Sequence, residues 1–450
     1  MEIRGSEGGV AIIHFDTMNQ IVGIRHEDKY VMERRVAVIP QHVKRLESEG
    51  IKFLIQYSPK RIFGHEAFEE AGARIVQSLN DAPVIIGVKE IPVETFEKGK
   101  TYMFFSHVIK GQKHNMPMLR AMMEKQCQLI DYEKIENQEK KRLIFFGRYA
   151  GLAGMINSLW SYGQRLEVMG IDNPFSGLRQ THTYKSLEDA RQAVSEVGKY
   201  IAENGLPDEL CPMVIGFTGY GNVSKGAQEI AHLLPSIEIT PAKLLEKGGV
   251  KPLKHLIYKV VFKESDLSLH KLGVEPFDLQ HYYKHPEEYK NQFEQYIPHL
   301  SILMNCMYWD TKYPRIVTKD ALLKLYTKGE PRLKVIGDVT CDPDGSIECT
   351  HKGTEIEDPV FVYDPLKQKT TNGFGGNGIL VMAVDILPSE LPRDASEAFS
   401  EALLPYLKSI ITADYTLSFD ELKLPGPIKN ALILHHGKLT PDYQYIAKYL

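Results

Sequence analysis

Short apolar runs alternate with amphipathic stretches along the first third of the chain. The segments FLIQY (53–57), ARIV (73–76) and PVIIGV (83–88) have the length and composition of buried strands. PQHVKRLESEG (40–50) has the apolar spacing of a surface helix, and its final glycine is placed to end it. Strands that alternate with helices predict a parallel sheet whose connections are crossover helices.

The same alternation returns in the middle of the chain after two predicted helices. These helices cover residues 149–170 and 186–205, and Ser186 with Asp189 forms a predicted cap at the start of the second. Small residues in the first helix permit close packing against another element; they are Ala150, Gly151, Ala153 and Gly154. The strand candidates that follow are MVIGF (213–217), SIEIT (236–240), HLIYKVVF (255–262) and LKVIGDV (333–339). A second βαβ region is therefore predicted, and the chain is assigned to the α/β class.

Composition narrows the class of protein without indicating an activity. The 450 residues carry a formal net charge of −4, with 43% hydrophobic and 25% charged residues, as soluble globular proteins do. No dense block of Lys and Arg appears, so binding to nucleic acid is not expected. The longest apolar stretch, ILVMAVDIL (379–387), is shorter than a membrane span and contains Asp385. The N-terminal MEIRGSEGG has no apolar core of the kind that secretory signals need.

Cysteine and histidine usage gives no sign of a metal site. The five cysteines are Cys127, Cys211, Cys306, Cys341 and Cys349. They form no C-x-x-C pair, so we expect free thiols in a reducing compartment and a cytoplasmic location. The neighbouring His435 and His436 lack a thiol or carboxylate at ligand spacing, and no metal is predicted.

A glycine-rich loop, Gly219-Tyr-Gly221-Asn-Val-Ser224, directly follows an apolar strand candidate. In a dinucleotide-binding fold the first glycine makes a tight turn, and the second lets the backbone approach pyrophosphate. The third small residue lets the helix and strand pack closely. Gly219 and Gly221 meet the first two needs, while Ser224 takes the third position with a hydroxyl that is able to donate to phosphate. The helix AQEIAHLL (227–234) after the loop favours nucleotide binding over a structural turn, which stays the alternative.

The choice of nucleotide depends on the end of the following strand. NAD sites usually place a carboxylate there, about twenty residues after the glycines, to hold the ribose diol. Glu238 falls within SIEITPAK (236–243), and the strand end supplies Thr240 and then Lys243. If Glu238 lies inside the strand, no carboxylate remains to repel a 2′-phosphate, and Lys243 is able to attract one. NADP(H) is therefore favoured, with NAD(H) as the alternative.

Two ionisable residues follow strongly apolar strands in the first third of the chain. Lys89 comes after PVIIGV (83–88), and His107 ends YMFFSH (102–107). Ligands gather at the carboxyl ends of strands in an α/β sheet. Partial burial there lowers the pKa of a lysine toward neutrality, and a histidine titrates near neutral pH. The alternative is structural, with Lys89 paired to Glu90 and His107 satisfied in the interior.

Arginine side chains supply candidate clamps for carboxylate groups, because a guanidinium binds a carboxylate through two hydrogen bonds. Arg35 and Arg142 are the candidates, with Arg34 and Lys110 as supporters. Solvated surface charge is the alternative for these cations. Asp338, near the end of LKVIGDV, lies either near a nicotinamide or in a turn.

Nine segments, taken together and in order, form a specific pattern. They are ERRVAVIP, IIGVKEIP, FFSHVIKGQ, LIDYEKI, FFGRYAGLAGMI, FTGYGNVSKGAQ, YWDTKYPRIVT, GDVTCDPDGSIE and VDILPSELPRDASEAF. The pattern resembles the lysine–ketoglutarate reductase family, with saccharopine dehydrogenases and alanine dehydrogenases as wider relatives. It spans nearly the whole chain from about residue 21.

The resemblance implies an α/β fold with two Rossmann-like domains, parallel sheets and an interdomain cleft. Residues 1–147 with 346–450 would form a discontinuous substrate-binding domain, and residues 148–345 the dinucleotide-binding domain. The implied reaction joins L-lysine and 2-oxoglutarate as an imine, which NADPH reduces to saccharopine. No nucleic acid or membrane partner is implied, and a homo-oligomer is compatible with the resemblance.

The resemblance also implies roles for individual residues. Lys89 and His107 would form the catalytic pair, since two groups that titrate near neutrality suit proton transfer. His107 would serve the carbinolamine oxygen, and Lys89 would exchange the proton on the bridging nitrogen. The implied substrate-binding residues are Arg35, Glu90, Lys110, Glu133 and Arg142. The residues assigned to the cofactor are Gly219, Gly221, Asn222, Val223, Ser224, Thr240, Lys243, Asn305 and Asp338.

Two rival functions stay open from the sequence. The nearer is an NAD-linked saccharopine dehydrogenase or an amino-acid dehydrogenase with a smaller substrate. The more distant is a non-catalytic nucleotide-binding protein, although the presence of Lys89 and His107 weighs against it. The chain ends at Leu450 without a second dehydrogenase domain, so we expect a monofunctional enzyme or a fragment of a larger protein.

Overall fold

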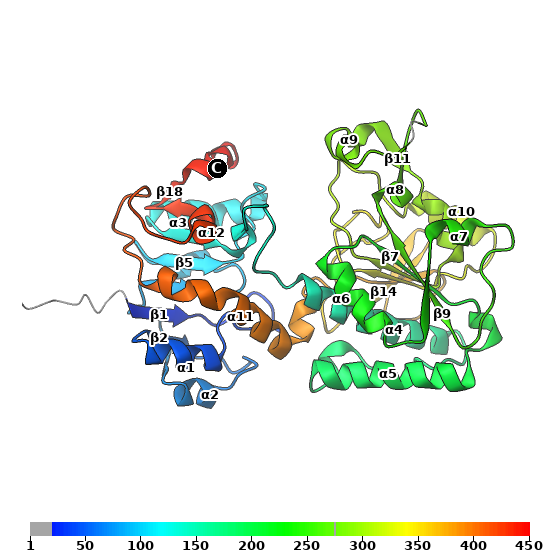
Figure 1. Ribbon diagram of the computed structural model, residues 1–450, viewed down its shortest axis with the longest axis horizontal. Helices are drawn as coiled ribbons and strands as arrows, with labels where there is room; N and C mark the ends of the chain where they lie inside the picture. The colour runs from blue at the N-terminus through cyan, green and yellow to red at the C-terminus, as the bar shows by residue number, and fades with distance from the viewer. Residues whose placement is uncertain (1–19, 274–275) are drawn as a thin grey trace, which may run out of the picture. The chain divides into compact units, whose positions relative to one another are not determined.

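The computed structural model describes residues 20–273 and 276–450. The N-terminal MEIRGSEGG lies outside the described residues, and so does the expectation drawn from it. The chain separates into two compact units, Met1–Phe145 with Ser396–Leu450 (unit 1) and Phe146–Ala395 (unit 2) (Figure 1). Among the described helices, none combines the length and apolar character needed to cross a bilayer.

Unit 1 contains one sheet of eight strands in the order β18-β17-β6-β5-β4-β1-β2-β3. The strands are β1 (Ile21–Ile24), β2 (Lys52–Gln56), β3 (Arg74–Val76), β4 (Val84–Ile86), β5 (Thr101–Phe104), β6 (Gln128–Asp131), β17 (Leu432–His435) and β18 (Lys438–Leu439). The helices are α1 (Pro40–Ser48), α2 (His65–Glu70), α3 (Met116–Glu124), α11 (Pro392–Ile411) and α12 (Gly426–Asn430). The first six strands pair in parallel, whereas β17 pairs antiparallel with β6. All residues of β4 and β5 are buried, which explains why their sequences are continuously apolar.

Unit 2 contains a second sheet of eight strands in the order β15-β14-β16-β13-β12-β7-β9-β8. The strands are β7 (Val214–Thr218), β8 (Ser236–Ile239), β9 (Ile257–Phe262), β12 (Ile302–Asn305), β13 (Val335–Asp338), β14 (Val360–Asp364), β15 (Lys369–Asn372) and β16 (Ile379–Met382). The helices are α4 (Gly147–Val168), α5 (Leu187–Asn204), α6 (Asn222–Ala231), α7 (Pro241–Leu245), α8 (Glu264–Leu267), α9 (Leu279–Lys284) and α10 (Lys319–Thr327). A small hairpin of β10 (Ser268–His270) and β11 (Tyr289–Asn291) stands apart from the large sheet. The α/β class predicted from the sequence is confirmed in both units.

Two features predicted for the helices of unit 2 are confirmed. The side chain of Ser186 accepts a hydrogen bond from the Asp189 amide (3.1 Å) and caps α5. Helices α4 and α6 touch through glycines: a Cβ at Gly151 would lie 1.9 Å from the Val223 carbonyl oxygen, and one at Gly226 2.1 Å from the Arg148 carbonyl oxygen. The two backbones are therefore too close for any side chain at these positions.

The predicted return of the chain to the first domain at residue 346 is wrong. The structure returns it at Ser396 and keeps residues 346–395 in unit 2. The physical reason is strand pairing: β16 lies parallel to β13, with Leu380 opposite Val335, and β14 lies antiparallel to β16. These strands complete the second sheet, so they fold with it.

We expect Gly226→Ala to lower the free energy of unfolding by about 1–3 kcal/mol, because the new methyl group has to force α4 and α6 apart. Alanine is the better helix former, so a stabilised variant would contradict the close contact. Gly177→Ala is the matched control, since a Cβ there meets nothing within 4 Å. Chemical denaturation of the two variants measures the difference.

Candidate functional site

Unit 1 brings His107 and Glu90 together at the carboxyl ends of adjacent strands. Glu90 follows β4, His107 follows β5, and these two strands pair in parallel. The Nδ1 atom of His107 lies 2.7 Å from Oε1 of Glu90. The same carboxylate oxygen binds Nζ of Lys29, also at 2.7 Å. Glu90, which the structural alternative paired with Lys89, thus forms a cluster with His107 and Lys29.

The cluster favours the charged forms of Glu90 and His107. Burial raises the pKa of Glu90, but the hydrogen bonds and charges of His107 and Lys29 outweigh it and lower the pKa to about 2. Burial lowers the pKa of His107, but Glu90 and then Glu133 raise it above its ordinary value. Near neutral pH the imidazole is thereby favoured as a proton donor.

Lys89 lies beside this cluster in the loop that follows β4, and its side chain approaches the loop that follows β1. Its Nζ is 5.5 Å from the centroid of the Tyr30 ring. Burial raises the pKa of Glu33, but Arg35 and also Lys89 lower it below its ordinary value. Lys89 and His107 are thus both at the carboxyl edge of one sheet, as the sequence predicted, and their catalytic roles stay predictions.

The predicted clamp Arg35 is engaged inside the protein. It is 3% exposed, and its Nε and Nη2 atoms donate to the two carboxylate oxygens of Glu33 at 2.8 Å and 2.6 Å. This two-bond face of the guanidinium is the one that a substrate carboxylate would need. The structure therefore makes Arg35 the partner of Glu33, and its role in substrate binding stays a prediction.

The other predicted substrate residues lie nearer the surface. Nη2 of Arg142 binds Oε1 of Glu133 at 3.1 Å, and the Arg142 side chain is 47% exposed. Lys110 is exposed in the loop after His107. Arg34 donates from Nε to the Lys60 carbonyl (3.2 Å). Arg142 and Lys110 keep the accessibility that a carboxylate-binding role requires.

Sequence reasoning missed two buried charges beneath Lys89. Glu27 is 6% exposed and accepts hydrogen bonds from the amides of Val88 (2.7 Å) and Lys89 (2.9 Å). Burial and then the charge of Glu33 raise the pKa of Glu27 to about 7. Burial also lowers the pKa of Arg61 to about 10. The sequence signal for Glu27 was the row of charged residues that follows the apolar run IVGI (21–24).

The glycine loop of unit 2 has the geometry of a phosphate-binding turn. Gly219 has a φ of +78°, and its amide donates to the Phe262 carbonyl (3.0 Å) at the end of β9. A Cβ at Gly221 would meet nothing within 4 Å, so space is open where a phosphate would approach. Helix α6 begins at Asn222, so its first amides, including that of Val223, lack intrahelical acceptors. The strand, loop and helix fit a dinucleotide.

Ser224 serves packing in this structure. It is completely buried, and its Oγ accepts a hydrogen bond from Nε2 of Gln228 (2.9 Å). The small third residue of the pattern is confirmed, whereas the suggested contact of its hydroxyl with phosphate is not supported.

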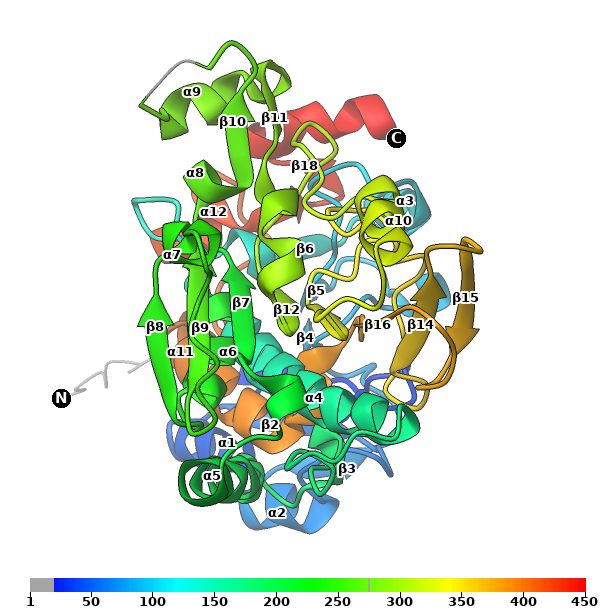
Figure 2. The same cartoon turned by 90° about the vertical axis from the view of Figure 1, so that its right-hand side faces the viewer.

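The strand order removes the structural premise on which Thr240 and Lys243 were assigned to the cofactor, namely that their strand lies next to the glycine loop. Figure 2 shows β9 between β8 and β7, so the strand next to the glycine loop is β9. Glu238 does lie inside β8, paired to Lys259 at 2.6 Å, but β8 is the edge strand. Lys243 forms an ion pair with Glu246. The strand end beside the loop instead presents Lys263.

Asn305 and Asp338 form a buried network under the carboxyl ends of three strands. Nδ2 of Asn305 donates to Oδ1 of Asp338 (2.8 Å), and Thr218 donates to Oδ1 of Asn305 (2.9 Å). Burial raises the pKa of Asp338, although bonds from Thr350 and Asn305 oppose it. Both residues are at most 1% exposed. The hydrogen bonds of Asn305 and Asp338 join the ends of β7, β12 and β13. Because both side chains are buried, the structure gives no support for their direct contact with a cofactor.

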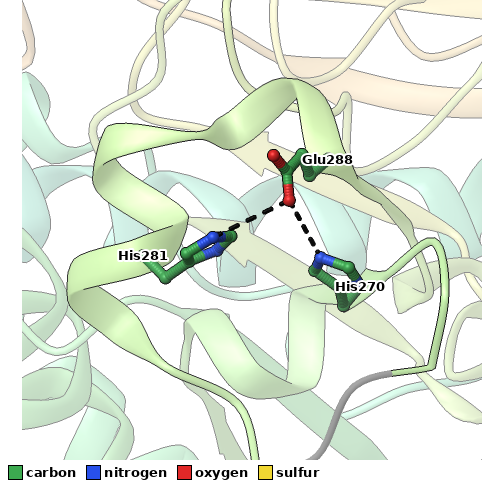
Figure 3. Close-up of side chains that lie close together, drawn as sticks. All are labelled: His270, His281 and Glu288. Atoms are coloured by element: carbon green, nitrogen blue, oxygen red, sulfur yellow. Dashed lines mark hydrogen bonds and ion pairs between the residues drawn. The ribbon is translucent and has the colours of Figure 1, made fainter.

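A separate histidine cluster closes the β10–β11 hairpin (Figure 3). Oε2 of Glu288 lies 3.1 Å from Nε2 of His270 and 3.7 Å from Nε2 of His281. The Leu272 amide donates to Nδ1 of His270 (3.2 Å), so the neutral ring carries its proton on Nε2 and donates it to Glu288. A metal ion needs that nitrogen deprotonated. The arrangement is therefore a hydrogen-bonded clamp of the hairpin.

Comparison with known proteins gives matches over both units. Residues 23–153 match the family model "Alanine dehydrogenase/PNT, N-terminal domain", and residues 274–442 match "Alanine dehydrogenase/PNT, C-terminal domain". Among solved structures, an L-alanine dehydrogenase matches with a TM-score of 0.60 at 16% identity, covering 95% of this chain and 99% of that one. That likeness concerns the fold.

Curated relatives match along almost the whole chain. Alpha-aminoadipic semialdehyde synthase of Arabidopsis thaliana is 38% identical over 447 residues, covering 96% of this chain and 41% of that protein. The mitochondrial protein of the same name from Mus musculus is 34% identical, covering 95% and 48%. A saccharopine dehydrogenase [NAD(+), L-lysine-forming] of Neurospora crassa is 27% identical, covering 87% and 91%. The chain spans less than half the length of the two synthases.

We expect Glu90→Gln to lower the pKa of His107, because burial then acts without the opposing carboxylate. NMR titration of the His107 ring should show the imidazole losing its proton at lower pH than in the wild type. Glu94→Gln, at an exposed residue of the same unit, should leave the titration unchanged. An unaltered His107 pKa in Glu90→Gln would contradict the described pair.

Proposed function

The chain belongs to the alanine dehydrogenase/PNT family, and from this membership we propose that it reductively condenses L-lysine with 2-oxoglutarate to form saccharopine. Identities of 34–38% to two alpha-aminoadipic semialdehyde synthases support this member of the family over an alanine dehydrogenase. The single observation that carries the mechanism is the His107–Glu90 pair beside Lys89 at one sheet edge. We assign the substrates to unit 1 and the nucleotide to unit 2.

The reaction needs proton transfers that suit the two residues of unit 1. The ε-amine of the lysine substrate attacks the ketone of 2-oxoglutarate, and the resulting carbinolamine loses water to become an imine. His107, whose protonated form is favoured by Glu90, donates to the departing oxygen, while Lys89 exchanges the proton on the bridging nitrogen. When bound, the reduced nicotinamide nucleotide supplies the hydride to the imine carbon. Glu133 assists by favouring the charged imidazole.

The nucleotide would be held by backbone groups of the loop and of the first turn of α6. Gly219 sets the turn, Gly221 leaves space for the pyrophosphate, and the amides of Asn222 and Val223 point their partial positive charge toward it. NADPH is favoured because Lys263 occupies the strand end where an NAD site usually has a carboxylate. The alternative, an NAD-linked saccharopine dehydrogenase, is supported by the neighbouring Glu264 carboxylate and by the similarity to the Neurospora crassa protein of that name.

A cytoplasmic location is retained as a proposal from the free cysteines. The mouse relative is named as a mitochondrial protein, so fractionation of the source cells distinguishes the two compartments.

Turnover should depend on lysine, 2-oxoglutarate and NADPH together. Lys89→Met and His107→Gln should each lower kcat by about 10²- to 10⁴-fold, because a proton-transfer group is lost, while the Kd for NADPH is unchanged. Steady-state rates and a fluorescence titration of NADPH measure the two effects. NADPH oxidation without lysine, or with pyruvate and ammonia instead, would refute the proposed reaction.

Lys263 and Lys243 follow neighbouring strands, β9 and β8, so variants of the two lysines test which one sets the preference between NADPH and NADH. Lys263→Ala should lower the preference for NADPH over NADH by about tenfold or more, because a charged contact with the 2′-phosphate is lost. Lys243→Ala should leave the preference unchanged, since Lys243 follows the edge strand and pairs with Glu246. The ratio of kcat/KM for NADPH and NADH measures the preference. A loss of preference in Lys243→Ala but not in Lys263→Ala would restore the assignment of Lys243 to the 2′-phosphate.

A further inference from the structure

A side chain replaces the missing backbone partner where the chain continues past the end of β4. The last backbone bond between β1 and β4 runs from the Arg25 amide to the Ile86 carbonyl (2.9 Å). Beyond it the Val88 and Lys89 amides donate to Glu27, one to each carboxylate oxygen, at 2.7 Å and 2.9 Å. Val88 is 1% exposed, so its amide has no ready access to water. Glu27 therefore continues the ladder with its side chain.

The opposite edge of the same backbone is held by β5. The Gly87 amide donates to the Met103 carbonyl (2.9 Å), and the Phe105 amide donates to the Val88 carbonyl (3.0 Å). Phe105 lies two residues before His107. The backbone that carries Lys89 is thus fixed between Glu27 on one side and the segment that leads to His107 on the other.

The side chain of Lys89 extends into the loop to which Glu27 belongs. Tyr30 of this loop presents its ring 5.5 Å from the Lys89 ammonium group, and the buried Glu33 responds electrostatically to the same charge. Glu27 itself accepts hydrogen bonds from the backbone of the segment that carries Lys89, and it is almost fully buried. Its position suits an anchor of the Lys89 backbone.

We propose that Glu27 is a positioning residue for Lys89, which sets through two backbone hydrogen bonds where the lysine enters the site without touching the substrate. The inference rests on the proposed function, because it assigns Lys89 to the proton transfers. A glutamine cannot replace the carboxylate, since its NH₂ group would face one of the two amide donors.

Glu27→Gln should lower kcat by about 10- to 100-fold, as expected when a reacting group is displaced, and leave the Kd for NADPH unchanged. The control is Glu47→Gln, because Glu47 also accepts a backbone bond in unit 1, from the Phe53 amide (2.8 Å), and lies on α1. Its kcat should match the wild type. A wild-type kcat in Glu27→Gln, or an equal loss in both variants, would overturn the proposal.

A readout that needs no substrate tests the position of Lys89 directly. The full chain is labelled with a small amine-reactive reagent, and the rate at Lys89 is followed by mass spectrometry. Glu27→Gln should change the Lys89 rate several-fold and leave the other lysines of unit 1 at their wild-type rates, whereas a general loss of structure would alter them all. Unchanged labelling of Lys89 would overturn the proposal.

Hydrogen exchange of the wild-type chain covers the case in which the variant does not fold. The amides of Val88 and Lys89 should be protected to the same degree as those of β4, although they lie beyond the end of the strand. Rapid exchange at both would overturn the anchor. If the wild-type chain shows no lysine-dependent oxidation of NADPH, the proposed function fails, while the labelling and exchange results still decide whether Glu27 anchors Lys89.

Discussion

The ion pair between His107 and Glu90 depends on β4 and β5 being adjacent parallel strands. Such strands end at the same edge of a sheet, so residues 17 positions apart in sequence come within 2.7 Å. His107 holds a left-handed backbone conformation, with a φ of +49°, which is unfavourable for a residue with a Cβ and is retained where the surroundings require it. Asn115 supports that conformation by donating to the His107 carbonyl (3.2 Å). The shared carboxyl edge of β4 and β5 therefore determines both the charge state favoured for the His107 imidazole and its nearness to Lys89.

In unit 2 the position of the glycine loop depends on a different constraint, which is the close backbone contact between α4 and α6. Gly151 and Gly226 let α4 lie directly against α6, and α6 is the helix whose first turn faces the glycine loop. Ser224 adds to this packing from inside the helix. The buried bonds of Asn305 and Asp338 tie the strand ends below. These contacts support the glycine loop from both sides, and a loop ordered in advance would lose less conformational freedom on binding the proposed nucleotide.

The sequence was sufficient to locate the strands along the chain but not to predict which strands are neighbours in the sheet. Apolar runs located β2, β4, β9 and β13 to within a few residues, because burial on both faces leaves a continuous apolar signature. The same signature does not say which strand lies beside β7, and the rule that places the ribose-binding residue assumes that strands follow the order of the chain. The insertion of β9 between β8 and β7 therefore moved the expected contact from Lys243 to Lys263. The domain boundary at residue 346, which the resemblance implied, likewise gave no information on the pairing of β16 with β13.

Local charge patterns have a similar limit, because they do not say which cations are already neutralised. Arg35 and Arg142 look alike in sequence, yet Glu33 holds the first in a buried two-bond pair, and Glu133 holds the second in a pair whose arginine is half exposed. Removing one partner from a buried pair is strongly unfavourable, whereas an exposed pair contributes only about 0–1 kcal/mol. If the proposed function holds, a substrate carboxylate would therefore displace Glu133 from Arg142 more readily than Glu33 from Arg35. Such an exchange also moves the Glu133 charge, which acts on His107, so substrate binding and the protonation of the imidazole would be coupled through one carboxylate.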